Sequence, residues 1–159
     1  MNLDKVNLYI ANPTQIIPLS DLYVQYLEEQ LSQHISLGLN PNDYNLKSEK
    51  IQEDLLPILE SEYSRVILAK TDKENTIGFG ISHIDLYSGY KYGHIDDIMV
   101  KKTYRNKGLG FRIYEEIKKW FITQQCESIN LTAYSNSKAI SFYQKLGFNP
   151  VGINFNLKL

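Results

Sequence analysis

The segment YRNKGLGFRIYEEIKKW, residues 104–120, places two glycines and two basic residues just before a stretch with helical periodicity. The first N–H groups of a helix have no intrahelical partners and lie at the positive end of the helix dipole, so this end attracts anions. Gly108 and Gly110 would let a ligand approach the backbone, and Arg105 and Lys107 add positive charge. One apolar stripe supports the helix: Leu109, Ile113, Ile117, Trp120 and Phe121. The segment therefore predicts a phosphate-binding turn.

Two common nucleotide-binding motifs fit this turn poorly. A P-loop requires Lys-Ser or Lys-Thr directly after its last glycine, whereas Phe111 and Arg112 follow Gly110 here. The dinucleotide fingerprint requires a third glycine near position 113, where Ile113 stands instead. A GxG pair is weak evidence alone, but the preceding strand and the basic residues make the turn more specific.

The strand before the turn, HIDDIMV at 94–100, breaks the alternation of apolar and polar residues. Val100 and Ile98 are apolar, so regular alternation would place the next apolar residue at position 96. The apolar residue is instead Ile95, and two aspartates, Asp96 and Asp97, follow it. A β-bulge would insert one unpaired residue and explain the slip. A frayed strand end with two solvated acids explains it equally well. The slip lies close enough to the turn for one ligand to reach both.

The periodicity of the remaining sequence predicts the element order βααβββαβαβ, an α/β sandwich with one mixed sheet in one domain over residues 1–159. Strands are expected at residues 6–10, 65–70, 77–81, 94–100, 129–133 and 151–159. Helices are expected at residues 19–31, 47–61, 109–121 and 137–146.

Composition excludes several classes of protein. The 159 residues carry a formal net charge of -1, which argues against a nucleic-acid-binding protein that depends on a basic field. No apolar run approaches the ~20 residues that span a bilayer, and the first residues lack a signal-peptide pattern. The one cysteine, Cys126, supports neither a disulfide framework nor a metal cluster. We therefore expect a cytoplasmic protein without a metal, membrane or nucleic-acid partner.

Two segments resemble the signatures of the GCN5-related N-acetyltransferase (GNAT) family. IMVKKTYRNKGLG, residues 98–110, resembles the acetyl-CoA-binding signature, although Lys102 stands where the family often has proline. SNSKAISFYQKLGF, residues 135–148, resembles the second signature, and the spacing and element order agree over most of the chain. The resemblance implies a mixed, mostly antiparallel sheet of six to seven strands, flanked by about four helices, with a β-bulge in the fourth strand.

The resemblance also implies a site for acetyl-CoA. Backbone groups of Ile98, Met99 and Val100 would hold the pantetheine arm and polarise the thioester carbonyl. Asn136 would hydrogen-bond the cofactor near this arm, and Tyr143 would face the sulfur. Backbone N–H groups of the turn would cradle the pyrophosphate: Arg105, Asn106, Lys107, Gly108, Leu109 and Gly110.

Direct acetyl transfer to an amine needs a free amine and a stabilised leaving thiolate. Deprotonating an amine of pKa ~10.4 at neutral pH costs roughly 4–5 kcal/mol, so a base or a water relay is useful. Asp96 and Asp97 are equal candidates, acting through water or by attracting a cationic acceptor. Tyr143 could give its proton to the thiolate, although a core aromatic residue would produce the same helical pattern.

We therefore expect an acetyl-CoA-dependent N-acetyltransferase that acetylates a primary amine of a small molecule, peptide or protein through a ternary complex. The alternatives are a non-catalytic acyl-CoA sensor of the same fold and an α/β domain that binds another anion. A faintly acidic, aromatic set of residues favours a cationic acceptor: Asp43, Tyr44, Asp85, Tyr87, Tyr90, Tyr92, Asp96, Asp97 and Tyr134. We expect His83 to have no ligand-binding role and Cys126 to be structural. The apolar face of the last strand could support a homodimer.

Overall fold

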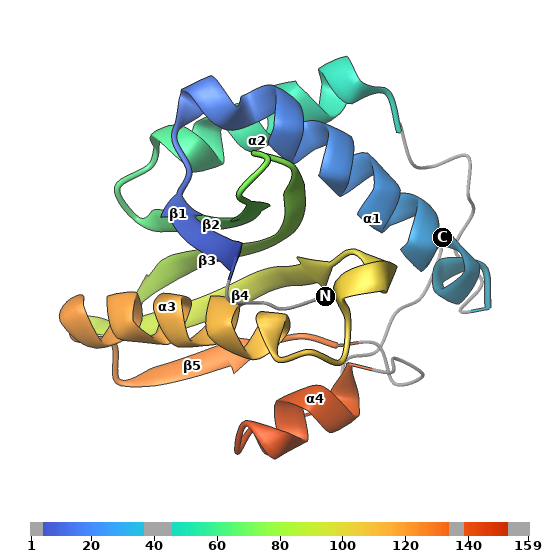
Figure 1. The fold of residues 1–159 in the computed structure, drawn as a ribbon. Helices are drawn as coiled ribbons and strands as arrows, with labels where there is room; N and C mark the ends of the chain where they lie inside the picture. The colour runs from blue at the N-terminus through green and yellow to red at the C-terminus, as the bar shows by residue number, and fades with distance from the viewer. Residues whose placement is uncertain (1–4, 37–45, 134–138, 153–159) are drawn as a thin grey trace.

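The computed structural model describes residues 5–36, 46–133 and 139–152. These residues form one five-stranded sheet with the strand order β1-β2-β3-β4-β5, and helices lie against both of its faces (Figure 1). The elements follow in the order β1 (Val6–Ile10), α1 (Ile16–Ser36), α2 (Ser48–Glu60), β2 (Ser64–Thr71), β3 (Thr76–Tyr87), β4 (Tyr90–Val100), α3 (Leu109–Thr123), β5 (Ser128–Leu131) and α4 (Ile140–Lys145).

This order confirms the predicted order as far as the last helix. The sheet is mixed and mostly antiparallel, because β1 to β4 pair antiparallel and β5 runs parallel to β4. The described residues contain five strands, whereas six to seven were expected. The strand predicted over 151–159 falls mainly on residues 153–159, which lie outside the described residues.

The sheet separates two apolar cores. Helices α1 and α2 cover one face and helix α3 covers the other (Figure 1). The core under α1 and α2 contains Ala11, Leu19, Leu22, Ile51, Leu55, Val66, Leu68, Phe79, Ile81 and Met99. The core under α3 contains Val6, Ile67, Ala69, Ile77, Ile84, Ile95, Leu109, Ile113, Tyr114, Ile117, Trp120 and Phe121. The whole predicted stripe of α3 is therefore buried, which fixes the position of the helix.

Helix α3 lies unusually close to the middle of the sheet. A Cβ atom on Gly80 of β3 would lie 2.5 Å from Ile113, and one on Gly93 of β4 would lie 2.6 Å from Phe121. Both distances are shorter than real side chains allow, so these positions require glycine. A Cβ atom on Gly110 would lie 3.9 Å from the side chain of Val100, so the first turn of α3 lies beside the end of β4.

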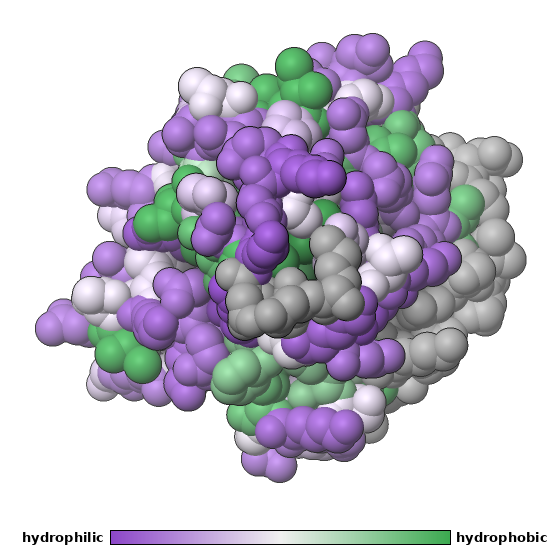
Figure 2. All heavy atoms as spheres, in the orientation of Figure 1, coloured by the Kyte–Doolittle hydropathy of each residue, from purple (hydrophilic) through white to green (hydrophobic). Residues whose placement is uncertain are grey.

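The face of the molecule seen in Figure 2 is mainly polar. Figure 2 shows polar residues over most of one face, with apolar residues in small separate groups. Among the described residues, no helix has both the length and the apolar character needed to cross a membrane.

Candidate active site

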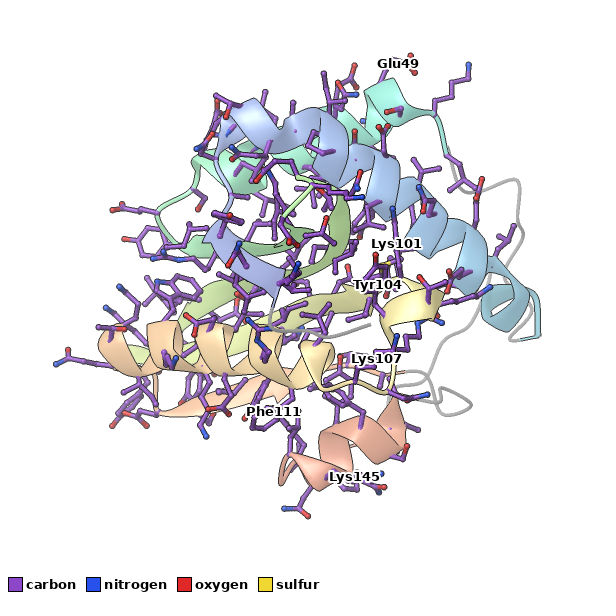
Figure 3. The ribbon with its side chains drawn as sticks, viewed as in Figure 1. Glu49, Lys101, Tyr104, Lys107, Phe111 and Lys145 are labelled. Carbon is purple, nitrogen blue, oxygen red and sulfur yellow. The ribbon has the colours of Figure 1, made fainter. Side chains whose placement is uncertain are left out.

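The connection between β4 and α3 has the backbone geometry of a ligand-binding turn. After Val100 the chain makes a short 3-10 turn, Lys102–Tyr104, and Gly108 then forms the N-cap of α3 with a left-handed φ of 85°. No side chain caps this helix end, and a Cβ atom on Gly108 would meet nothing within 4 Å. Figure 3 shows Lys101, Tyr104 and Lys107 spaced along this connection. The first N–H groups of α3 thus remain suited to an anion.

The basic side chains of the turn are held by the protein itself. Arg105 donates from Nε to the Val100 carbonyl at 2.7 Å, and its Nη2 pairs with Glu29 of α1. Lys102 lies 3.9 Å from the same carboxylate, and Lys107 donates to the Thr103 carbonyl at 2.8 Å. Arg105 therefore fixes the turn against α1, and the helix-end amides are the better anion donors.

Strand β4 is open on one side beside this turn. It pairs with β5 only from Tyr92 to Ile95, opposite Ser128 to Leu131. The following backbone of β4, residues 96–100, has no partner strand on that side among the described residues. An extended ligand can therefore lie along this edge.

The pairing of β4 with β3 shifts register at the aspartate pair. Asp97 lies opposite Ile81, but Ile95 lies opposite the next residue of β3, Ser82, so Asp96 is an extra residue on β4. Ile95 belongs to the core under α3, and Asp97 contacts residues of α1 on the other face. The slip in the sequence pattern and this register shift fall at the same residues.

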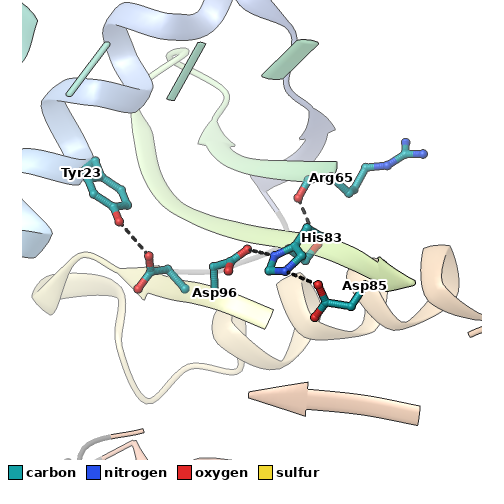
Figure 4. A network of polar contacts seen from close by, with 7 residues as sticks. Tyr23, Arg65, His83, Asp85 and Asp96 are labelled. Carbon is teal, nitrogen blue, oxygen red and sulfur yellow. Dashed lines mark hydrogen bonds and ion pairs between the residues drawn. The ribbon is translucent and has the colours of Figure 1, made fainter. Parts of the chain in front are cut away.

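Two tyrosines of α1 hold the carboxylate of Asp97. Tyr23 donates from its hydroxyl to Oδ2 at 2.9 Å, and Tyr26 donates to Oδ1. Figure 4 shows Tyr23 reaching from the helix to the strand. The two rings lie 5.6 Å apart and both contact Phe79, a fully buried residue of β3.

The surroundings of Asp97 change its acidity. Burial raises the pKa of this carboxyl group, the hydrogen bonds from Tyr26 and Tyr23 lower it, and the result is about 6. Burial together with the negative charge of Asp97 raises the pKa of both tyrosines above the ordinary phenol value, so both stay protonated. Asp97 is therefore ionised at neutral pH but more basic than an ordinary carboxylate.

Asp96 belongs to a different cluster. It bonds Nδ1 of His83 at 2.9 Å, and Nε2 of the same ring lies 3.3 Å from Asp85 (Figure 4). Burial lowers the pKa of His83, but the two carboxylates outweigh it, and the pKa lies above its usual value. The structure thus separates two acids that the sequence left equivalent.

Tyr143 of α4 is half-buried, and it lies close enough to Asp97 for the charge of that carboxylate to act on its hydroxyl group. Its ring centroid is 5.2 Å from that of Phe142 and 5.9 Å from that of Phe148. Burial, with the charge of Asp97, raises the pKa of Tyr143 to about 12. Asn136, the other residue expected near the pantetheine arm, lies outside the described residues.

Sequence reasoning missed Tyr23, Tyr26, Glu29 and the partners of His83. The two tyrosines are three residues apart on a helix, and this spacing is also typical of a core-facing stripe. Cys126 was expected to be structural, and burial raises the pKa of its thiol, which makes it a poor nucleophile.

The acetyltransferase (GNAT) family matches residues 24–148, which contain the turn, the shifted strand and Tyr143. The chain belongs to the GNAT family. It is similar to glucosamine 6-phosphate N-acetyltransferase 1 of Dictyostelium discoideum, with 35% identity over 69 residues that cover 43% of each chain. The corresponding enzyme of Trypanosoma brucei brucei is 35% identical over 60 residues, which cover 38% of this chain and 40% of that one. This GNAT chain therefore spans less than half the length of these curated relatives.

Solved structures share the GNAT fold over nearly the whole chain. A tetramutant of the BH1408 protein from Bacillus halodurans is 22% identical with a TM-score of 0.76, covering 96% of this chain and 99% of its own. The aminoglycoside N-acetyltransferase AAC(6')-Iy in complex with CoA is 16% identical with a TM-score of 0.76, covering 97% of this chain and 94% of its own. At these identities the likeness concerns the fold.

The raised pKa of Asp97 makes stability depend on pH. Because the folded-state pKa of about 6 exceeds the ordinary value of 3.8, the folded protein binds more protons than the unfolded chain between these values. Asp97 therefore lowers the free energy of unfolding as pH rises through this window, by up to about 3 kcal/mol. We expect Asp97→Asn to gain stability relative to the wild type between pH 4 and 7, measured by urea unfolding. A constant difference between the two proteins would contradict this assignment.

Proposed function

We propose that this protein is an acetyl-CoA-dependent N-acetyltransferase that transfers the acetyl group directly to a primary amine in a ternary complex. One observation carries the proposal. The uncapped N-terminus of α3, the open edge of β4 and the half-buried Asp97 lie at consecutive positions of one connected segment. An anion site, an extended-ligand site and a tuned base are the parts that such a transfer requires.

Acetyl-CoA would bring a diphosphate anion and an acetyl thioester to this segment. The N–H groups at the start of α3, around Gly108 and Gly110, suit the diphosphate. The open edge at Ile98, Met99 and Val100 suits the pantetheine arm. We interpret the register shift at Asp96 as the expected β-bulge, which leaves a backbone N–H free to donate to the thioester carbonyl oxygen.

Asp97 is the better of the two candidate bases. An ordinary carboxyl group lies about 6.5 pKa units below an alkylamine, which corresponds to about 9 kcal/mol for proton transfer. A pKa of about 6 reduces this gap to about 6 kcal/mol, while roughly nine-tenths of the group stays ionised at pH 7. Asp96 is exposed and already bound to His83. Asp97 therefore takes the proton of the acceptor amine, directly or through water.

Tyr143 stabilises the leaving thiolate by donating a hydrogen bond. With a pKa of about 12 the phenol is protonated at neutral pH. Complete proton transfer to a thiolate of pKa about 8.5 would cost about 5 kcal/mol. The hydrogen bond is therefore the main contribution of Tyr143, and solvent supplies the proton that the thiolate finally takes.

The acceptor that fits this end of the site is a cation. Two carboxylates act on the Asp97 cluster, Asp96 on Asp97 and Asp54 of α2 on Tyr23. These charges attract an ammonium group and repel a phosphate. The tyrosine rings add faces on which a cation can lie.

Asp97→Asn should lower kcat/KM about 100- to 1,000-fold at pH 7, because the amine loses its base. Asp96→Asn should lose less than about tenfold, since its partner is His83. The measurement is CoA release, followed with a thiol reagent, from acetyl-CoA and a panel of amines. If none of the amines in the panel leads to CoA release, the alternative of a non-catalytic acyl-CoA sensor is favoured. A greater loss in Asp96→Asn would reverse the assignment of the base.

Tyr143→Phe should lower kcat about 10- to 100-fold, the effect of losing one hydrogen bond to a developing charge. The dissociation constant for acetyl-CoA should stay nearly unchanged, because the ring and its packing remain. Turnover kinetics and calorimetry together test this. Unchanged turnover would remove Tyr143 from the mechanism.

Gly108→Ala should weaken CoA binding, because its Cβ atom would enter the open space in front of the helix amides. Gly89→Ala is a matched control, since Gly89 in the β3–β4 turn has the same φ of 85° and equally open space. Both variants should lose roughly 1–2 kcal/mol of stability from backbone strain. The rise in melting temperature on adding CoA should shrink by more than half only in Gly108→Ala. Equal rises in both variants would contradict the binding site, and ATP and NAD serve as ligand controls.

A further inference from the structure

Helix α1 supplies two hydrogen bonds to a single carboxylate of another element. Tyr23 donates to Oδ2 of Asp97 at 2.9 Å and Tyr26 donates to Oδ1, so each oxygen receives one phenol. An ionised carboxylate offers about four lone-pair positions. The two phenols therefore fix the plane of the carboxylate and leave the remaining positions for another donor.

The two phenols are held in place by packing. The ring of Tyr23 lies 5.4 Å from that of Phe79 at 31°, and the ring of Tyr26 lies 5.8 Å from it at 89°. Phe79 is fully buried in β3, the middle strand of the sheet. Because one rigid ring supports both tyrosines, their hydroxyl groups cannot turn away from Asp97 without disturbing the core.

A third contact holds the same helix at the cofactor side. Glu29 lies six residues after Tyr23 on α1, and it pairs with Arg105 and lies 3.9 Å from Lys102. Residues three or four apart lie on the same face of a helix, and Glu29 lies three residues after Tyr26. One side of α1 therefore contacts both the shifted strand and the turn that follows it.

We propose that Tyr23 and Tyr26 are positioning residues that orient Asp97 and keep it ionised, so that it can receive the acceptor amine. The inference rests on the proposed function of this site. A phenol that donates to a carboxylate stabilises the charged form and carries no charge of its own. Such a donor therefore keeps the base ionised. Unlike lysine or arginine, it does not repel a cationic acceptor.

The groups that face Asp97 from each neighbouring element support this role. Burial and the charge of Asp96 on β4 both raise the pKa of Asp97 and so favour its protonated form. The hydrogen bonds from the two phenols lower this pKa and favour the ionised form. Tyr143 on α4 and Asp54 on α2 add no positive charge. Without the phenols, the pKa of Asp97 should be higher and a larger fraction of the group should be protonated.

Tyr26→Phe and Tyr23→Phe test the proposal, because each keeps its ring and removes one hydrogen bond. We expect the acid limb of the kcat/KM profile, near pH 6 in the wild type, to move upward by about one unit in each variant. At pH 6.5 kcat/KM should then fall about threefold, and it should recover at higher pH. Tyr63→Phe is the matched control, since Tyr63 is 45% exposed between α2 and β2.

A direct titration separates this inference from the proposed function. The titration is followed by NMR in protein labelled with ¹³C-aspartate. The carboxyl resonance of Asp97 is assigned as the one that is missing from the spectrum of Asp97→Asn. Its midpoint should lie near pH 6 in the wild type and higher in both tyrosine variants. If the wild type acetylates no amine, the proposed function fails and this titration alone decides the inference. Unmoved midpoints would overturn it, and if one variant does not fold, the other decides.

Discussion

One extra residue in strand β4 controls the rest of the site. Side chains alternate between the two faces of a strand, so a shift of one residue exchanges the faces of everything beyond it. Ile95 lies under α3, and without the shift Asp97 would lie there too, buried among Ile113 and Ile117. The extra residue, Asp96, instead turns Asp97 toward the tyrosines of α1. A carboxylate that would be intolerable in one core thus becomes a hydrogen-bonded group at the edge of the other.

The pKa of Asp97 sets a balance between stability and the proposed role of this group as a base. Burial alone would favour the neutral acid, which cannot accept a proton, whereas full exposure would give an ordinary and weak base. The two phenols hold the group between these limits at a pKa of about 6. This position costs folding free energy at neutral pH, since the folded state must keep a partly desolvated charge. Such costs are typical of functional sites and are offset by the well-packed cores on both faces of the sheet.

Sequence patterns predicted the features whose signals are local. The alternation of β1 to β5, the buried stripe of α3, the glycine turn and the slip at Asp96 each occupy a few consecutive residues. The contacts that define the site are not local. Tyr26 and Asp97 are separated by 71 positions, and Glu29 and Arg105 by 76. The tyrosines of α1 also fit a core stripe, so their hydroxyl groups become informative only when the strand they face is known. The same limit left Asp96 and Asp97 equivalent, because only the register shift assigns them to different neighbours.

One fold can serve many different acceptors, so the choice of acceptor depends on the elements that surround the site. The curated relatives matched here are named for a sugar phosphate, and they match less than half of this chain. In this protein α1 and α2 bring phenols and Asp54 toward Asp97, and the positive side chains of the neighbouring turn, Arg105 and Lys102, lie against Glu29. A phosphate beside Asp97 would meet like charge, and two cations of the neighbouring turn already lie against Glu29. An ammonium group would meet carboxylate oxygens and aromatic faces. If Asp97 is the base, as we propose, helix α1 would both position the base and favour a cationic acceptor.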